Sequence, residues 1–522
     1  MEKLKERSNV AFNYVFAVLF GIITIGASTV LFNNIFVVIT TALFMLTLIF
    51  LGGRLYKSDK EITEKQVNIF FIVMIAVMFL TQLIFGYFLK STPVTDWWTI
   101  DTIAKNFAES GNFENMYDGL PKGRHQYMAR YPNNNGILIL LSLYYRVIYL
   151  ILGWVPKYAA VVLNTVFITT AVVFIFLIAK KIFKPKGALV TAIACFIFLP
   201  YYTYTAYYYS DSLSIPFTAI SVYLVILGAK SEKGKWGKKI LYLLLAGLST
   251  AIGYTLKGSL LVILVGAVVY FVLCNKPKQA IISCTSIVIA VAVFISGINI
   301  FVKSFNFTNE EELYEQQYPT NHWIMMGLKD DGDFNQDDAT FTRNAGNYDQ
   351  KKAAANEQIG KRLEEMGLIG LAEHLYEKII FTWDDGTYWI SNHINSKDEN
   401  GNQIENRNIL FEFVLKDGKY HNIFYLYSNS LHMCMLLLIV ISGFLATKKR
   451  KITKMTLIHG IVFGVTLFFM IWETRSRYLF NFTPLFILTA VNGLISLWDT
   501  LKLTELKHTF QKNPLKILSH KN

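Results

Sequence analysis

The stretch VNIFFIVMIAVMFLTQLIFGYFL, Val67–Leu89, decides the fold, because its 23 residues include no Asp, Glu, Lys or Arg. A helix needs about 20 mostly apolar residues to cross the hydrocarbon core of a bilayer, so this stretch predicts a membrane span. The whole 522-residue chain has the same character. It is 53% hydrophobic and only 17% charged, whereas a soluble domain is about 25% charged. The composition excludes an ordinary soluble enzyme, and the 40 Phe and 29 Tyr exclude a disordered chain.

Thirteen apolar runs predict an all-α polytopic membrane protein with about 12–13 transmembrane helices. The runs lie near 11–31, 33–51, 67–89, 136–153, 157–179, 188–207, 213–229, 239–256, 259–274, 279–302, 424–446, 455–473 and 478–498. The basic N-terminus has no small-residue cleavage site after a short apolar core, so we expect the first run to stay as an uncleaved span. The four cysteines lie in or beside apolar runs without metal or redox spacing, which is typical of small hydrophobic residues.

The basic loops give the orientation, because Lys and Arg gather on the cytoplasmic side. They begin at Lys3, Arg54, Lys180, Lys230, Lys276, Lys448 and Lys502. All of them share one side only if an odd number of crossings lies between residues 90 and 180, where two apolar runs occur. The run 136–153 carries Arg146 and several tyrosines, so we expect it to lie at the interface or in a re-entrant position. The alternative is that both runs span and one basic loop breaks the rule.

Twelve spans place both termini inside and the two long loops outside. The loop 303–422 holds 22 of the 37 acids and 12 Lys and Arg, a net charge of −10, which leaves +23 on the remaining residues. Topology and an anionic inner leaflet therefore explain the positive charge, and no nucleic-acid motif occurs. We expect four parts. They are two N-terminal spans with a cytoplasmic loop (1–66), a core containing a first outer catalytic loop at 90–135 (67–302), a large acidic outer loop of mixed structure (303–422), and C-terminal spans with a cytoplasmic tail (423–522).

Seven charged residues fall at the expected outer ends of spans, where an ionisable group is costly and therefore a candidate for function. They are Asp96, Asp101, Asp211, Lys257, Glu473, Arg475 and Arg477. Asp96 begins a predicted interfacial helix with an apolar stripe at Trp97, Ile100, Ala104 and Phe107. Asp96 is either the N-cap of this helix or a general base. Asp101 points about 140° away from Asp96 around the helix, so the two carboxylates are not expected to share a face.

The three cations each have a structural and a functional interpretation. Lys257 either snorkels to the interface or contacts a phosphate. Arg475 and Arg477 either pair with Glu473 and anchor the interface, or bind phosphate through their planar guanidinium groups.

Three other patterns have simpler interpretations. The tyrosines of 201–209 predict an aromatic belt, with sugar stacking as the alternative. The acidic run 330–338 lacks the Gly and Glu of an EF-hand loop, so we expect a solvated turn. No ligand spacing occurs at His125, His322, His393 and His421, so no metal site is indicated, although a divalent metal stays possible in principle.

The order of several motifs resembles the GT-C superfamily of membrane glycosyltransferases, in its protein-mannosyltransferase-like group (glycosyltransferase family 39-like, Gram-positive type). The motifs are Thr95-Asp96-Trp97 before Ile103-Ala104, Tyr131-Pro132-Asn133, Ser210-Asp211, Thr-Leu-Lys-Gly at 255–258, and Arg477-Tyr478 with Pro484. The stretch 321–328 in the large loop looks like sequence found in Gram-positive members of this group. Many members have Asp-Glu at the first acidic site, whereas this chain has Asp96-Trp97.

The resemblance implies an extracytoplasmic active site in the cell membrane that takes a sugar from a polyprenyl-phosphate carrier, with inversion. Asp96 would be the general base. Lys257, Arg475 and Arg477 would bind the donor phosphate, and Asp101, Asp211 and Glu473 would form a supporting acidic or acceptor site. The Lys-, Asn- and Ile-rich usage suggests an AT-rich bacterium, with undecaprenyl phosphate as carrier. The acceptor would be teichoic acid, another surface glycopolymer, or a protein.

Two other functions stay open. One is a polysaccharide polymerase or ligase that uses a lipid-diphosphate oligosaccharide. The other is a flippase or transporter for lipid-linked sugars, a class that often shows inverted repeats and helices broken by Gly or Pro at mid-membrane. No internal repeat is seen here, and the candidate charges lie at the outer boundary.

Overall fold

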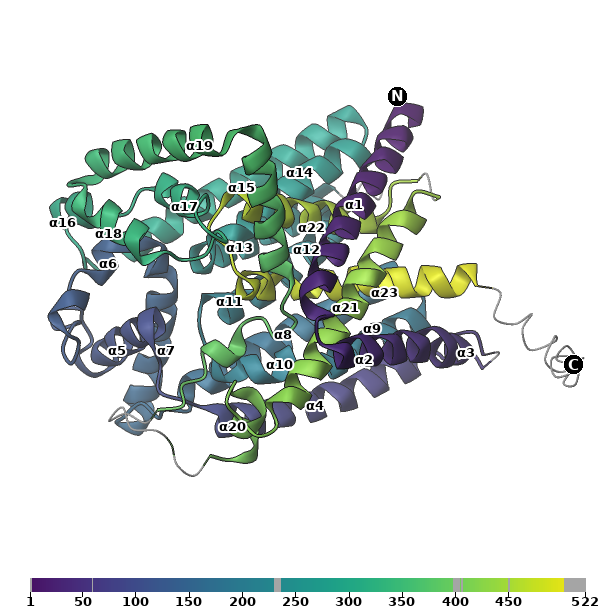
Figure 1. Ribbon diagram of the computed structural model, residues 1–522, viewed down its shortest axis with the longest axis horizontal. Helices are drawn as coiled ribbons and strands as arrows, with labels where there is room; N and C mark the ends of the chain where they lie inside the picture. Colours follow the sequence, from purple (N-terminus) through teal and green to yellow (C-terminus); the bar gives the residue numbers. More distant parts are fainter. Residues whose placement is uncertain are drawn as a thin grey trace, which may run out of the picture.

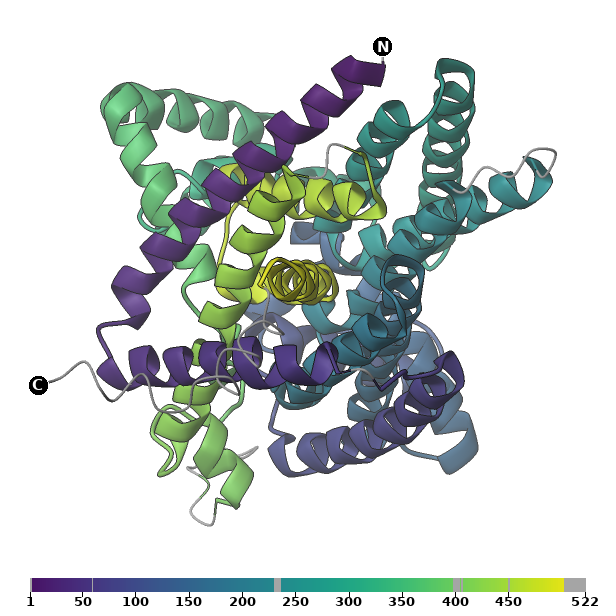
Figure 2. The ribbon, with the colours of Figure 1, turned by 90° about the vertical axis from the view of Figure 1, so that its right-hand side faces the viewer.

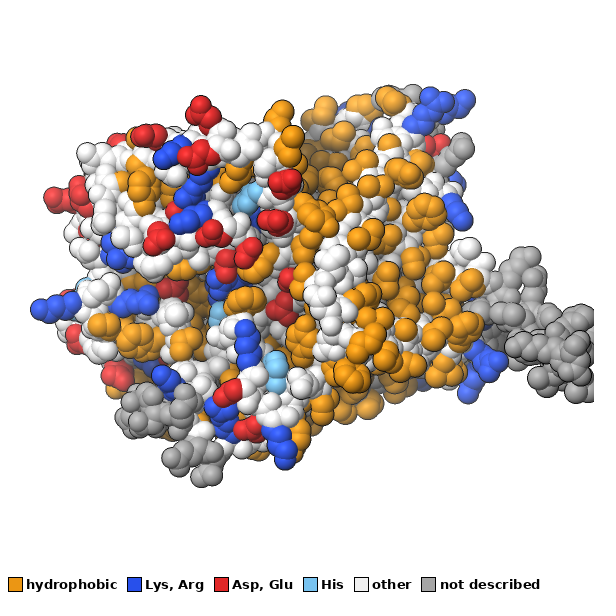
Figure 3. All heavy atoms as spheres, viewed as in Figure 1, with side chains coloured by type: hydrophobic (Ala, Val, Ile, Leu, Met, Phe, Trp, Pro, Cys, Tyr) orange, Lys and Arg blue, Asp and Glu red, His pale blue; other side chains and the backbone are white. Residues whose placement is uncertain are grey.

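The computed structural model describes residues 2–58, 60–229, 236–397, 404, 407–448 and 451–501, and these form an all-α membrane protein. Eleven of the described helices are long and apolar enough to cross a membrane, or twelve if one bent pair counts as a span. Figure 3 shows hydrophobic side chains as a broad band between a polar, charged head and a narrower edge with Lys and Arg. This distribution is that of a helical bundle in a bilayer, capped on one side by a polar head.

The helices of the bundle surround α23, which Figure 2 draws end-on at the centre, while α1 and α2 run across that view (Figures 1 and 2). The bundle helices are α1 (Glu2–Leu31), α2 (Ile35–Leu46) with η1 (Thr47–Gly52) and α3 (Gly53–Tyr56), α4 (Glu64–Leu89), α8 (Ala159–Ile182), α9 (Pro185–Ile197), α10 (Pro200–Thr203) with η4 (Tyr204–Ala206), α12 (Ile215–Ala229), α13 (Trp236–Leu256), η5 (Gly258–Leu261), α14 (Val262–Cys274), α15 (Pro277–Lys303), α21 (His421–Ala446), α22 (Lys454–Ile471), η7 (Ser476–Phe482) and α23 (Thr483–Thr500).

The stretch that predicted the fold forms α4, and its first turn shows why it begins there. Thr63 and Gln66 make a capping box, in which each side chain accepts a hydrogen bond from the other residue's backbone N–H. Such a box satisfies N–H groups that have no partner within the helix. Further along, the buried amide of Gln82 donates to the carbonyl of Tyr201 at 2.8 Å and accepts from Thr169 at 2.7 Å. The polar group inside the bilayer is thus satisfied, and it fixes α4 against its neighbours.

The basic loops meet at one end of the bundle, which we call the basic end. The ammonium group of Lys5 lies 2.6 Å from the carbonyl oxygen of Asn275, that of Lys186 lies 2.6 Å from the Ser58 oxygen, and that of Lys454 lies 2.6 Å from the Lys181 oxygen. The sequence predicted that these loops lie on one side of the membrane, and these contacts bring their described parts together. Its further residues Lys230, Lys233, Lys235, Lys449, Arg450 and the tail from Lys502 lie outside the described residues.

The helix α7 (Asn135–Leu152) begins and ends at the opposite end of the bundle. Near its start, Gly136 is packed against the carbonyl of Thr255, at the end of α13. Near its end, Arg146 donates to the carbonyl of Ala108 in the first long loop at 2.7 Å. Length and composition alone would count this segment as a span. The contacts show instead that it does not traverse the bundle, as its arginine and tyrosines predicted, and Figure 1 draws it across the direction of α2 and α23.

The run 188–207 is a broken span. The helix α9 and the following α10–η4 segment meet at an angle of 57°. Pro200 stands directly after the break, and proline cannot donate a backbone hydrogen bond inside a helix. The bend carries the chain into the tyrosine-rich segment 201–209.

The polar head consists of the two long loops together with α7 and α11, and it is built from helices and turns. Its elements are α5 (Thr95–Ser110), η2 (Lys122–Arg124), α6 (Tyr127–Arg130), η3 (Pro132–Asn134), α7, α11 (Ser210–Leu213), α16 (Glu310–Gln316), α17 (Thr320–Met326), α18 (Gln336–Asn344), α19 (Tyr348–Trp383), η6 (Ile390–Asn392) and α20 (Ile409–Val414). The described part of 303–422 contains no strand. Its longest helix, α19, turns sharply at Gly367, which has a φ of 59° and a non-helical ψ. Glycine tolerates this left-handed conformation, so α19 can lie first on the head and then against α1.

Candidate functional site

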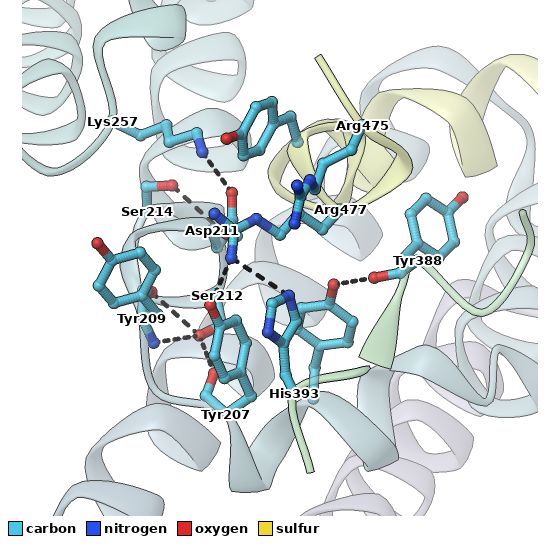
Figure 4. Close-up of polar contacts among 12 residues, drawn as sticks. Tyr207, Tyr209, Asp211, Ser212, Ser214, Lys257, Tyr388, His393, Arg475 and Arg477 are labelled. Atoms are coloured by element: carbon cyan, nitrogen blue, oxygen red, sulfur yellow. Dashed lines mark hydrogen bonds and ion pairs between the residues drawn. The ribbon is translucent and has the colours of Figure 1, made fainter. Parts of the chain in front are cut away.

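Three of the seven charged candidates meet at the end of the bundle opposite the basic loops, which we call the site end. Asp211 lies in α11, Lys257 directly follows α13, and Arg477 lies in η7. The Lys257 ammonium is 2.5 Å from Asp211 Oδ1, and Arg477 Nε is 3.8 Å from Asp211 Oδ2. Figure 4 shows the carboxylate between the two cations. The snorkelling interpretation of Lys257 is therefore wrong, since its charge is held by a partner inside the protein.

The cluster is buried but incompletely satisfied. The Asp211 side chain has no exposure, and each cation is 16% exposed. Asp211 Oδ2 and Arg477 Nε are buried without a hydrogen-bond partner among the described residues. Buried polar groups in native proteins are normally hydrogen-bonded, so such groups need an explanation. Two cations share one carboxylate here, and the arrangement can accept the oxygens of a further anion.

The other side of the Arg477 guanidinium is held in place by two rings. Its Nη1 lies 2.8 Å from the Tyr207 hydroxyl and 3.2 Å from His393 Nε2, and the two rings stack at 4.3 Å between centroids. Burial, and after it the charges of Arg477 and Arg475, lower the pKa of His393 well below its usual value. The imidazole is therefore neutral, and its Nε2 can accept the hydrogen bond from Arg477. Sequence spacing gave no signal for His393, because it lies on a distant loop.

Glu473 lies beside the cluster without an ion pair to either arginine in the described residues. Its Oε1 accepts a hydrogen bond from the Tyr478 hydroxyl at 2.7 Å, and burial raises its pKa. The Lys257 ammonium lies 3.9 Å from the centroid of the Tyr478 ring, so Tyr478 connects the acid to the lysine. The expected salt bridge from Glu473 to Arg475 and Arg477 is wrong, because each arginine pairs with a different acid.

Arg475 reaches into the head. Its Nε donates to Asp333 Oδ1 at 2.6 Å, and its guanidinium carbon lies 5.5 Å from the Trp389 ring centroid. Asp333 belongs to the acidic run expected to be a solvated turn. In the same run, Asp338 is buried and pairs with both terminal nitrogens of Arg362, at 2.7 and 2.8 Å. The run is thus partly ion-paired, and it connects the head to the site.

The turn that supplies His393 has an unusual backbone. Tyr388 and Trp389 have φ values of 53° and 64°, which side-chain-bearing residues rarely adopt. Asp385 stabilises this turn by accepting from the Trp389 backbone N–H at 2.7 Å and from the Ser476 hydroxyl at 3.0 Å. Strained backbone of this kind persists only where its surroundings hold it, and it concentrates at functional sites. Here it links the loop of His393 to the segment that carries Arg477.

Asp96 lies at the edge of this site in the first turn of α5. The N-cap of α5 is Val94, so the interpretation of Asp96 as N-cap is wrong. Asp96 Oδ1 accepts from Arg124 at 3.1 Å, and the Asp96 side chain is 46% exposed. Burial, followed by the charge of Asp96, raises the pKa of Tyr209. The Arg477 guanidinium carbon lies 5.9 Å from the Tyr209 ring centroid, so the charges of Asp96 and Arg477 both act on this residue.

Asp101 belongs to a separate, saturated network. It accepts hydrogen bonds from Tyr145 at 2.6 Å and Tyr208 at 3.0 Å, and it pairs with Lys105 at 2.6 Å. These contacts attach α5 to α7 and to the tyrosine segment. The predicted apolar stripe of α5 is also buried. Its Trp97 lies edge-on to Tyr208, with 4.9 Å between the ring centroids. The structure therefore places Asp101 as an anchor, apart from the cations.

The tyrosine segment is not an aromatic belt. All six of its tyrosines are at most 6% exposed, namely Tyr201, Tyr202, Tyr204, Tyr207, Tyr208 and Tyr209. A belt residue would face the membrane interface, whereas these rings are packed inside the protein, and Tyr207 and Tyr209 lie against Arg477. Among the described residues no group of three or more His, Cys, Asp or Glu is arranged to hold a metal ion.

Comparisons with known proteins add a family and several distant structures. A family model described as "Conserved hypothetical integral membrane protein" matches residues 9–495. A search of curated proteins finds no match. Among solved structures, the chain is similar to the oligosaccharyltransferase AglB from Archaeoglobus fulgidus, determined with an inhibitory peptide and a dolichol-phosphate, at 12% identity and a TM-score of 0.39. That match covers 83% of this chain and 51% of AglB, so the chain spans about half the length of that relative.

A second similar structure is ArnT from Cupriavidus metallidurans. Its form bound to undecaprenyl phosphate matches at 10% identity with a TM-score of 0.30, and its apo form at 11% with 0.32. Each match covers 81% of this chain and 77% of ArnT.

Proposed function

This chain belongs to the family of conserved hypothetical integral membrane proteins, and from that premise we propose that it is a membrane glycosyltransferase. It moves a sugar from a polyprenyl-phosphate carrier to an acceptor on the outer side of the membrane. The observation that supports this best is the buried cluster of Lys257, Arg477 and Asp211. Two cations share a single carboxylate, and Asp211 Oδ2 and Arg477 Nε have no hydrogen-bond partner within the described part of the chain.

The cluster suits a lipid-linked phosphate for a chemical reason. Lysine supplies a compact positive charge and arginine a planar fork, and both are common phosphate ligands. Cations fixed in a water-poor site stabilise charge that develops on a leaving phosphate. Lys257 and Arg477 are the donor-phosphate ligands in this proposal. Arg475 contributes through its charge and through the head loop that it holds by Asp333.

The acceptor side of the reaction is assigned to Asp96. Its carboxylate takes the proton from an acceptor hydroxyl or amine, whose oxygen or nitrogen then bonds to the anomeric carbon. The bond between that carbon and the phosphate oxygen breaks, and the electron pair leaves with the phosphate beside Lys257 and Arg477. One displacement without a covalent enzyme intermediate inverts the anomeric centre. Asp211 and Glu473 set the charge of the site. Asp101 holds α5 in place, so that Asp96 faces the site.

The orientation follows from the two ends of the bundle. Loops rich in Lys and Arg stay in the cytoplasm, so the basic end faces inward and the site end faces outward. The acidic head then covers the site from outside, where a surface glycopolymer or protein would arrive as acceptor. In a bacterium the carrier would be undecaprenyl phosphate.

Reconstitution tests the proposal. The purified protein is reconstituted in proteoliposomes. It is supplied with a radiolabelled sugar on either a polyprenyl-phosphate or a polyprenyl-diphosphate carrier, and a cell-envelope extract provides the acceptor. We expect transfer from the monophosphate, and its loss in Lys257→Ala and Arg477→Ala. Lys303→Ala, which changes an exposed lysine outside the cluster, is the matched control. Transfer from the diphosphate alone would favour a polymerase or ligase, and unchanged activity of both cluster variants would refute the assignment.

A further inference from the structure

Two cavities adjoin each other at the basic end, and neither has a residue of the Asp211 cluster in its lining. One is a groove of about 400 Å³ between η1, α9, α21 and α23, and the other is a pocket of about 370 Å³ between α1, α22 and the end of α23. Tyr56 lines both of them. The end of α23 separates them, with Trp498 on the groove side and Asp499 on the pocket side. Figure 2 looks onto this end and shows α23 end-on between α1, α2 and α21.

The groove is apolar and faces the bilayer. Its walls include Leu48, Leu51, Leu189, Ile193, Met435 and Trp498. Leu51 is 56% exposed and Ile193 is 43% exposed, so the groove is open towards lipid. Its shape depends on η1, a π-helical segment whose wider turn frees the carbonyl of Leu48 to accept from the Trp498 indole at 3.0 Å. Such π-helical insertions are rare and concentrate at functional sites.

The pocket is polar although membrane helices form it. His459 is fully buried, its Nδ1 lies 2.8 Å from Asn13 Oδ1, and its Nε2 lies 2.9 Å from the Ser442 hydroxyl, which also accepts from Asn492 at 2.8 Å. Polar side chains within membrane spans are costly and usually mark a functional path or site. The hydrogen-bonded wall gives this pocket a fixed shape.

Two exposed lysines line the pocket. Lys184 and Lys451 have no ion pair within the parts of the chain that the structure describes, and the opposing acid in the lining is Asp499. The neighbouring Lys186, which lines the groove, is already hydrogen-bonded to the carbonyls of Tyr56 and Ser58. The pocket therefore carries a net positive charge beside an apolar groove, and this combination is complementary to an anionic amphiphile.

We propose that the paired cavities bind an anionic phospholipid of the surrounding bilayer. Its phosphate headgroup lies in the polar pocket between Lys184 and Lys451, and one acyl chain lies in the groove against Trp498. Both volumes fall in the range of about 300–1,000 Å³ that is usual for small-ligand sites. Basic residues at a membrane surface attract anionic lipids, and the phosphate provides acceptors for the two lysines. This site is independent of the glycosyltransferase proposal, since its headgroup pocket lies at the basic end and shares no residue with the Asp211 cluster.

Photolabelling of the full-length protein in nanodiscs tests the proposal. The probe is phosphatidylglycerol with a diazirine on one acyl chain. The comparison probe carries the same diazirine on phosphatidylcholine. Labelled peptides are identified by mass spectrometry. We expect phosphatidylglycerol to label 189–198 and the segment around Trp498. Lys184→Glu combined with Lys451→Glu should lower that labelling about tenfold. Ala194→Trp, which fills the groove, should lower it as well, and thermal unfolding verifies that each variant is folded.

The control is the double change Lys276→Glu and Lys278→Glu, which has the same charge effect at the basic end but lies outside both cavities. It should leave the labelling unchanged. Three results would overturn the proposal. They are equal labelling by phosphatidylcholine, an equal loss in the control variant, and displacement of the probe by polyprenyl phosphate but not by unlabelled phosphatidylglycerol.

Discussion

The ammonium nitrogen of Lys257 lies 2.5 Å from a carboxylate oxygen of Asp211, a side chain with no solvent exposure. The two residues come from different elements, 46 positions apart. Burial lowers the pKa of Lys257, and the charge of Asp211 opposes this shift. Arg477 lies on the other oxygen of the same carboxylate. Asp211 thus holds together two cations that would otherwise repel each other.

The first prediction concerns this pair. Asp211→Asn should destabilise the protein by about 3–5 kcal/mol, since removal of one partner of a buried pair leaves the other charge uncompensated. Lys257→Met should lower the free energy of unfolding by less than Asp211→Asn does, because Arg477 still faces Asp211. The double variant should lose less stability than the sum of the losses in the two single variants. Thermal unfolding in detergent measures this cycle, and strictly additive losses would show that the two charges are not coupled.

The second prediction concerns Asp96. Its side chain is 46% exposed and pairs with Arg124. Exposed pairs contribute about 0–1 kcal/mol, so Asp96→Asn should leave the melting temperature almost unchanged. Sugar transfer should fall by at least about 100-fold if Asp96 is the general base. Arg124→Gln is the control for loss of the ion pair and should retain most of the activity. Equal losses in both variants would assign the effect to the pair and not to the base.

The third prediction concerns stability against pH. Burial, and after it repulsion by Asp385, raises the pKa of Asp384 to about 7. A carboxyl whose pKa is higher in the folded state stabilises the fold below its unfolded pKa, and this contribution is lost as pH rises through about 7. Between about pH 5 and about pH 8, the wild type should therefore lose more stability than Asp384→Asn. Melting curves of both proteins across this range measure the difference, and parallel profiles would contradict it.

The fourth prediction concerns topology. In a background without the four native cysteines, single cysteines at Asn133 and Trp154 flank α7, and a third at Lys184 marks the basic end. An impermeant maleimide added to whole cells should label positions 133 and 154 but not 184. Labelling of only one of the two flanking positions would mean that α7 crosses the membrane. Labelling at position 184 would show that the basic end faces outward, the opposite of the proposed orientation.

The sequence predicted the helical membrane fold because apolar length is a local property. The run 67–89 is α4, and the mixed composition of 136–153 identified a segment that does not traverse the bundle. Asp211, Lys257 and Arg477 were found for a similar reason. A charge at the end of an apolar span is conspicuous in one dimension, whatever the tertiary structure is.

The partners of these charges were not predictable in the same way. His393 and Asp385 come from a long polar loop, in which charged and aromatic residues are ordinary. Their place at the site depends on the strained turn at Tyr388 and Trp389 and on the bend of α19 at Gly367. The tyrosines of 201–209 have the composition of an interface belt, and only the packing of α10 and η4 shows that they are buried. Tertiary contacts, and not local pattern, decided these positions.

In the proposed function, Lys257 and Arg477 hold the phosphate of a lipid carrier. An experimental structure of the protein in nanodiscs supplied with polyprenyl phosphate would test this directly. We expect density for a phosphate within hydrogen-bond distance of Lys257 and Arg477, with the lipid chain leading away between helices. Phosphate density only at Lys184 and Lys451, with the Asp211 cluster unchanged and empty, would contradict it.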